Sequence, residues 1–487
     1  MFSNHHKSRF SHLALWVGVL GVGFGIVAGL LAGIQPLLLC VGLVAVVTVV
    51  YFFASFEKAV LGLLILRSSL DIFSAQQIPA AFAIGLDALA LLYVTVMLLT
   101  GRTIRTDRFW WFFAGWVVLQ SMWLVLMLLG GLGLDASYLP DSIREWMRLF
   151  SWLVVYFLLM QLQECFHPEK IVSILFFSLI LPLIVASLQM LVPASLLPSI
   201  LVHAGDEANS LPFEPASRIN GTLGHYNTFA VFLVLFIGLT LWKLLQSQRR
   251  LPWALLLLVL TFFLASTKTI AGLAMLATLI IVMFAITIRP NPLYLIGSIV
   301  LVALLLGLVF GFFMSTEFGR ERLSSIADTP LLNPNIDASR AVLMSWSDGN
   351  SFNWRVAQWT FLLQAWQNAP ILGYGLGNTH YIGVMYSAAH NDYIRALVEG
   401  GIVGIASFLL FFQVQFFRLI RLIWCAPKGS SQRKFCAVLI AYLVAMLVGM
   451  ITENIWSHTT MFFYWFALSA VAGGNWNKSE LAQARTI

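Results

Sequence analysis

Long apolar runs alternate with short polar segments along almost the whole chain. A helix needs ~20 residues to cross a bilayer, and fourteen runs reach or approach that length. The two shortest runs are 57–72 and 252–267. This pattern predicts an all-α polytopic membrane protein with about 14 transmembrane helices. The predicted spans are 12–34, 36–55, 57–72, 82–100, 108–130, 146–163, 169–192, 223–246, 252–267, 270–288, 292–314, 394–420, 434–452 and 458–474.

Composition supports this fold class. The chain has 487 residues, of which 60% are hydrophobic and only 10% charged, with 17 Trp and 38 Phe. A soluble protein of this length has no interior large enough for so much apolar surface. The first run, 12–34, is too long for the core of a signal peptide and lacks a small-residue cleavage pattern, so we expect it to remain as a span.

The distribution of basic residues predicts the topology. With the N-terminus inside, alternating spans place 18 of the 28 Lys and Arg residues in inside loops. This bias follows the positive-inside rule and puts both termini in the cytoplasm. The net charge of +7 is spread over these short loops, so no nucleic-acid partner is indicated.

Two predicted outside segments are long enough to carry function. They cover residues 192–221 and 315–389, within a single integral membrane domain 1–487. In the larger loop, apolar residues recur at three- and four-residue steps over 353–368. This spacing predicts an amphipathic helix lying along the membrane surface.

Cysteine and histidine spacing indicates neither disulfides nor a metal. Cys40 lies in a predicted span, and Cys165, Cys425 and Cys436 lie at the inside surface. No ligand spacing typical of zinc is present, and no cofactor is expected.

Several cations break the positive-inside bias at the outer surface. Arg218 comes just before a predicted span, Lys268 lies between two short spans and Arg355 opens the predicted surface helix. All three are expected near the outer membrane surface, where guanidinium groups can bind phosphate oxygens in pairs. Snorkelling to lipid phosphates is the simpler alternative for each arginine. His390 stands at the entrance of the span 394–420, where a histidine can titrate near neutral pH.

Residues beside His390 are suited to begin a helix. The side chains of Asn391 and Asp392 can accept hydrogen bonds from backbone N–H groups in a first helical turn. Asp392 could instead orient His390, and both roles remain open.

Three blocks of this sequence resemble the O-antigen ligase and polymerase superfamily of bacterial envelope proteins. The first is Arg218-Ile-Asn-Gly-Thr-Leu-Gly-His-Tyr-Asn227. The second is Trp354-Arg355 with the later run Pro370-Ile-Leu-Gly-Tyr-Gly-Leu-Gly377, and the third is His390-Asn-Asp-Tyr with the later run Glu399-Gly-Gly-Ile-Val-Gly404. Together they cover residues 218–404 in the order typical of the family.

The resemblance implies a metal-independent, inverting glycosyltransferase of the GT-C type. Such proteins take a glycan from undecaprenyl pyrophosphate on the outer face of the bacterial inner membrane and pass it to a glycan or lipid-linked acceptor. The partners that the resemblance implies are these two substrates, membrane lipids and other polysaccharide-assembly proteins. The donor's pyrophosphate is a leaving group whose growing charge cations can stabilise.

The same resemblance assigns roles to individual residues. Arg218, Arg355 and Lys268 bind the pyrophosphate, and His390 is the general base. The supporting residues are Asn227, Asn391 and Asp392. Family members often carry Ser-Arg-Gly where this chain has Thr267-Lys268-Thr269, and lysine lacks the bidentate fork of arginine.

Two alternatives remain open. One is a small-molecule or ion transporter of the same superfamily, for which the charge of Asp87 inside a predicted span is the main indication. The other concerns the acceptor, since no sequence feature separates a polymerase from a ligase. We favour the enzyme over the transporter, and the polymerase over the ligase.

Overall fold

The structure is a computed structural model. It describes residues 36–163, 165–202, 218–287, 336–347, 351–383 and 387–476, together with isolated positions between 300 and 335. The chain divides into two compact units, 1–60 and 61–487. The first contains α2 (Pro36–Ala54), and α3 (Phe56–Arg67) crosses the boundary.

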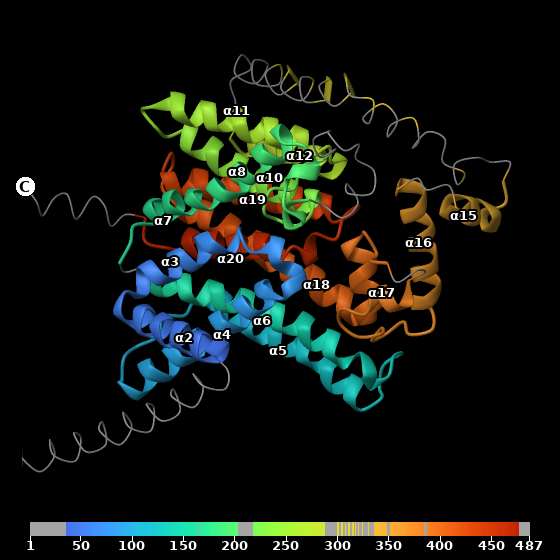
Figure 1. The fold of residues 1–487 in the computed structure, drawn as a ribbon, viewed down its shortest axis with the longest axis horizontal. Helices are drawn as coiled ribbons and strands as arrows, with labels where there is room; N and C mark the ends of the chain where they lie inside the picture. The colour runs from blue at the N-terminus through green and yellow to red at the C-terminus, as the bar shows by residue number, and fades with distance from the viewer. Residues whose placement is uncertain are drawn as a thin grey trace, which may run out of the picture. The chain divides into compact units, whose positions relative to one another are not determined.

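The described residues are helical and contain no strand, which confirms the predicted all-α class (Figure 1). The remaining helices are η1 (Asp71–Gln76), α4 (Ile78–Leu99), α5 (Arg108–Leu128), η2 (Ala136–Tyr138), α6 (Leu139–Leu162), α7 (Pro168–Leu175), η3 (Phe176–Leu179), α8 (Ile180–Leu191), η4 (Ala194–Leu196), η5 (Ser199–Leu201), α10 (Tyr226–Leu244), α11 (Arg250–Ser266), α12 (Ile270–Thr287), α15 (Ala338–Ser347), α16 (Ser351–Trp366), α17 (Thr379–Ile382), α18 (Asp392–Cys425), α19 (Ser431–Gly449), η8 (Ile455–Ser457) and α20 (Thr459–Ala472).

Six helical segments in the described part of the chain are long and apolar enough to cross a membrane. They are Ile78–Leu99, Arg108–Leu128, Pro168–Leu191, Tyr226–Leu244, Asp392–Cys425 and Ser431–Gly449. Shorter apolar helices cover Gly42–Ala54, Arg250–Ser266, Ile270–Ile286 and Thr459–Ala472. The run 12–34 and most of 292–314 lie outside the described residues. The count of 14 spans and the GT-C architecture stay predictions.

Burial differs sharply between these helices and separates the interior from the lipid-facing surface. In the most apolar 18-residue stretch of each helix, 83% of α10 is buried but only 22% of α4. The outer helices α4, α5 and α11 expose large apolar side chains such as Leu98, Val118 and Leu258. Water would penalise such surfaces, but the hydrocarbon core of a bilayer accepts them. The chain is therefore a multi-pass membrane protein.

Aromatic side chains fill the interior where α18 meets the C-terminal helices. The ring of Trp456 lies 4.9 Å from Phe408, 5.0 Å from Trp152 and 5.3 Å from Phe462, all in edge-on geometry. Offset and edge-to-face contacts of this kind stabilise aromatic clusters beyond simple burial. This packing fixes the loop between α19 and α20, which carries part of the candidate site.

Helix α18 is broken at Gly401, where φ is +62° and ψ is −159°. The segment 370–375 replaces the backbone hydrogen bonds that the break removes. Ile402 donates to the carbonyl of Pro370 at 2.9 Å, and Tyr374 donates to the carbonyl of Val398 at 3.0 Å. The second and third sequence blocks are therefore joined backbone to backbone, which explains their glycines: a Cβ on Gly401 would lie 2.2 Å from the carbonyl carbon of Ile371.

The predicted loop 315–389, which includes segment 370–375, also carries the predicted surface helix. Helix α16 contains most of the range 353–368 and packs against α18 (Figure 1). The placement of 315–389 and 192–221 outside the membrane stays a prediction, and 203–217 lies outside the described residues.

Gly401→Ala is expected to destabilise the protein by ~2–3 kcal/mol or more, because it combines a left-handed backbone with a backbone clash. Gly85→Ala in α4 is the matched control, since a Cβ there meets nothing within 4 Å. Thermal melting of both variants in detergent checks this. Similar melting temperatures for the two variants would contradict the close docking at Gly401.

Candidate active site

A single buried carboxylate brings together residues from all three sequence blocks. Glu453 lies between α19 and η8 and is 5% exposed. Its Oε1 accepts a hydrogen bond from Nη2 of Arg355 at 2.9 Å, and its Oε2 accepts one from Nδ2 of Asn227 at 2.6 Å. Nδ1 of His390 lies 3.8 Å from Oε2, within ion-pair range but beyond a hydrogen bond.

The fold places each of these groups from a different element. Asn227 is in the first turn of α10, whose N-cap is His225. Arg355 is on α16, and His390 stands directly before α18. The structure therefore brings together three of the candidate residues, Asn227, Arg355 and His390, and their shared contact is Glu453, which the sequence prediction did not include. Their catalytic roles stay proposals.

His390 is held in a conformation that non-glycine residues rarely adopt. Its φ is +48°, in the left-handed region, and such strain persists only where the surroundings enforce it. Trp359 donates to the carbonyl of Ala389 at 2.7 Å, and the ring of Trp354 packs edge-on at 5.7 Å from the imidazole. Asn391 caps α18 by accepting from the N–H groups of Tyr393 and Ile394 at 3.0 Å. The imidazole is thereby aimed by a fixed backbone.

Electrostatics keep Glu453 ionised. Burial raises the pKa of this carboxyl, but the imidazole of His390 and the guanidinium of Arg355 outweigh burial and hold the pKa below its ordinary value of 4.5. A carboxylate that is ionised at neutral pH and faces Nδ1 favours a proton on that nitrogen. The other ring nitrogen, Nε2, is then free to accept a proton from a substrate.

The remaining predicted cations form a second group. Nε and Nη2 of Arg218 donate to the backbone carbonyls of Thr267 and Lys268 at 3.2 and 3.1 Å. The guanidinium carbon also lies 3.2 Å from the ring centroid of Tyr226, the neighbour of Asn227. Lys268 has a left-handed backbone, with φ +53°. Arg218 thus braces the turn that carries Lys268, and Tyr226 connects this pair of cations with the Glu453 group.

Asp392 faces away from this group. Its carboxylate accepts from the backbone N–H of Trp456 at 2.8 Å and from Nε of Arg395 at 3.2 Å, and it is fully buried. The carboxylate beside His390 in the structure is that of Glu453, not that of Asp392. The helix cap is supplied by Asn391.

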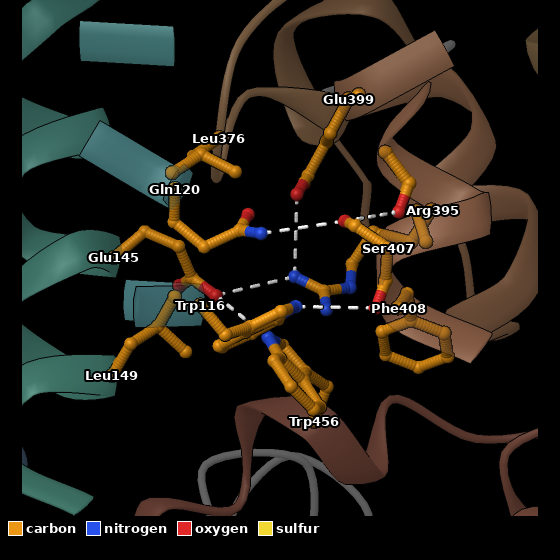
Figure 2. Close-up of a pocket in the computed structure, with 13 residues that line it drawn as sticks. Trp116, Gln120, Glu145, Leu149, Leu376, Arg395, Glu399, Ser407, Phe408 and Trp456 are labelled. Carbon is orange, nitrogen blue, oxygen red and sulfur yellow. Dashed lines mark hydrogen bonds and ion pairs between the residues drawn. The ribbon is translucent and has the colours of Figure 1, made fainter. Parts of the chain in front are cut away.

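A buried ion network lies beneath the site. Figure 2 shows the guanidinium of Arg395 between Glu145 and Glu399, at 3.3 Å from an oxygen of each. Trp456 donates from its indole nitrogen to Glu145 at 3.1 Å. The cavity that these residues line is only about 30 Å³, which holds water rather than a sugar. We read this network as structural support for the turn at His390.

The predicted topology could have pointed to Glu453, which the sequence prediction did not include. In the predicted scheme the outside loop after span 434–452 contains one acid, Glu453, on the same side as His390. Arg395 and Glu399 stand in the third block itself. Among the described residues, no group of three or more His, Cys, Asp or Glu side chains has the geometry to hold a metal.

Asp87, the charge that suggested transport, lies inside the helix bundle. It is 3% exposed, and its Oδ2 accepts a hydrogen bond from Ser151 of α6 at 2.7 Å. This contact ties α4 to α6, as expected for a bonded polar residue in a membrane interior.

Comparison with known families identifies the central part of the chain. Residues 253–409 match the family model for O-antigen ligases. The match includes Lys268, Arg355 and His390, whereas Asn227 and Glu453 lie outside it. It covers about a third of the chain and confirms the predicted resemblance to the O-antigen ligase and polymerase superfamily. The match supports a membrane enzyme of polysaccharide assembly. No curated protein gives a match.

Glu453→Gln is expected to lower the free energy of unfolding by roughly 3 kcal/mol at pH 7, because it leaves Arg355 without its buried partner. The pKa of Glu453 is lowered in the folded protein, so its charge stabilises the fold above pH 4.5 and loses this effect as the pH falls below 4.5. The difference from wild type should shrink over the same window in thermal melts.

The control is Arg144→Gln, which removes an exposed pair with Asp141 at 3.4 Å. Exposed pairs contribute less than ~1 kcal/mol, so little change is expected at any pH. Equal stability of Glu453→Gln and wild type at neutral pH would contradict an ionised, paired Glu453.

Proposed function

We propose that the protein transfers a glycan from undecaprenyl pyrophosphate to a sugar hydroxyl of an acceptor at the periplasmic face of the bacterial inner membrane. The observation that carries the proposal is the convergence of Asn227, Arg355 and His390 on the carboxylate of Glu453. In this scheme both termini are cytoplasmic. The reaction is that of a polysaccharide polymerase or ligase, and the polymerase is favoured.

His390 is the general base in this mechanism. The acceptor oxygen attacks C1 of the donor sugar, and its proton passes to Nε2 of His390. The bond from C1 to the pyrophosphate oxygen breaks, and the electron pair leaves with the pyrophosphate. Attack from the opposite face inverts the anomeric carbon. Glu453, 3.8 Å from Nδ1, stabilises the imidazolium that forms, as a carboxylate does in other carboxylate–histidine pairs.

The cations supply the countercharge for the leaving group. Arg355 lies beside His390 through their shared partner Glu453, and Arg218 and Lys268 stand at the turn next to α10. Charge that develops on the pyrophosphate in a poorly hydrated site is stabilised strongly by fixed cations. No metal ion or organic cofactor enters this scheme.

A transporter of the same superfamily is the competing function. Its main support, Asp87, is already bonded to Ser151 within the bundle. Purified protein in detergent separates the two functions, because transfer of a glycan to an acceptor needs no second compartment, whereas transport does. The glycan phenotype of a deletion strain then separates polymerase from ligase: short chains of one repeat indicate a lost polymerase, and absence of attached glycan indicates a lost ligase.

His390→Ala and His390→Asn are expected to reduce transfer by about 10²–10⁴-fold, because each removes the general base. Asparagine tolerates a positive φ, so His390→Asn preserves the backbone and tests the chemistry alone. The measurement is transfer in detergent from a purified undecaprenyl-pyrophosphate glycan, with accumulation and melting as checks of folding. Near-normal transfer by a folded variant would remove the general-base role.

Arg218→Lys and Arg355→Lys are expected to slow transfer about ten- to a hundredfold. Lysine keeps the charge but loses the planar fork, and each charge-assisted contact is worth roughly 1.5–3 kcal/mol. Arg340→Lys is the control, since Arg340 is exposed on α15 and outside the three blocks. If all three variants behave alike, Arg218 and Arg355 are surface cations and the pyrophosphate assignment is wrong.

A further inference from the structure

A second and larger cavity shares Glu145 with the small one in Figure 2. Its volume is about 580 Å³, within the ~300–1,000 Å³ typical of ligand pockets. One wall comes from residues 67–84, at the end of α3, in η1 and in α4, and the other from the first half of α6. Gly377 and His380, from the O-antigen ligase domain, and Thr459, at the start of α20, complete it.

The charges of this cavity are balanced. Arg144 lies 3.4 Å from Asp141, Arg148 is paired with Glu145, and Arg67 lies 2.6 Å from Asp71. Each arginine in the lining therefore has a carboxylate partner, and two of these carboxylates, on Asp141 and Glu145, line the cavity themselves. A phosphate would meet like charge here, which disfavours it. The cavity thus differs from the turn at Arg218 and Lys268, where Arg218 donates to backbone carbonyls.

Hydrogen-bonding capacity remains in the lining. Besides the ion pairs, the polar side chains of Ser74, Gln77, His380 and Thr459 line the cavity. The lining therefore suits a neutral ligand rich in hydroxyl groups, which accept and donate at once.

The α4 wall is apolar. Pro79, Ala80, Ala83 and Ile84 line the cavity there. A sugar ring has an apolar C–H face and a rim of hydroxyls, so it can lie on this wall and turn its rim to the arginines and carboxylates opposite. A polyprenyl chain could cover the apolar wall but has no group that hydrogen-bonds to the charged wall opposite.

We infer that this cavity binds the glycan chain of the acceptor and directs its end toward His390. This inference rests on the proposed function. The cavity adjoins the site through Glu145, which contacts Arg395 and Trp456, and through Thr459, which follows the loop that carries Glu453. The ligand class is a neutral or weakly charged oligosaccharide of a few sugar units.

Ala83→Trp tests the assignment by filling the cavity from the α4 wall without changing any charge. Ala81→Trp is the matched control, since Ala81 is exposed on the same helix and is not part of the lining. Two measurements are made on the full chain in detergent. The first is direct binding of a lipid-free oligosaccharide of the producing bacterium's own surface polysaccharide, and the second is transfer kinetics with varied acceptor and varied donor.

Ala83→Trp is expected to abolish oligosaccharide binding and to raise the acceptor KM roughly tenfold or more, a loss of about 1.4 kcal/mol per factor of ten. The donor KM and the melting temperature should match those of Ala81→Trp. A rise in donor KM with unchanged oligosaccharide binding would assign the cavity to the lipid-linked donor and overturn the inference. Unchanged values for both substrates would overturn it as well.

Failure of the inference can be told apart from failure of the proposed function. If the wild type binds the oligosaccharide, and Ala83→Trp does not, but no transfer from the lipid pyrophosphate occurs, the cavity assignment stands and the proposed reaction fails. If the wild type and Ala83→Trp both transfer with the same acceptor KM, the reaction stands and the cavity assignment fails.

Discussion

A helix that breaks in apolar surroundings must have its lost backbone hydrogen bonds replaced, and in α18 the segment 370–375 does this at Gly401. The N-terminal half of α18 carries Asp392, Arg395 and Glu399, and His390 stands directly before it. The docking of segment 370–375 fixes that half helix against α16 and the loop before α17. The position of His390 therefore depends on the replacement hydrogen bonds that segment 370–375 makes at Gly401.

Charge is arranged in two layers around this half helix. The inner layer, with Arg395 among Glu145, Asp392 and Glu399, is closed and leaves only a water-sized cavity. The outer layer centres on Glu453 and faces Arg355 and His390. Buried ion networks contribute little net stability but fix one arrangement of their partners, which is what an aimed imidazole needs. The structural and the chemical groups are therefore separate but adjacent.

The sequence predicted the helical class and offered Asn227, Arg355 and His390 as candidates, because apolar runs and short polar blocks are local features. It missed Glu453, since a single acid in a short loop carries no local pattern and acquires meaning only when α10, α16 and α18 converge on it. The sequence also left Asp392 as a candidate partner of His390, but in the structure Asp392 contacts Arg395 and Trp456. Adjacency in the sequence does not fix the direction in which a side chain points. The cavity between α4 and α6 could not be predicted from the sequence either, because the residues of its two walls are far apart in the chain.

The position of Glu453 near the end of the chain has a consequence for biogenesis. Asn227 is made and inserted 226 residues before its partner carboxylate. A ribosome-bound chain that has exposed His390 but not yet inserted α19 and the following loop has an imidazole without its orienting charge. Under the proposed mechanism, a nascent chain is then inactive toward lipid-linked glycan until the loop after α19 is in place. An unfinished or truncated copy would leave the donor lipid to complete chains.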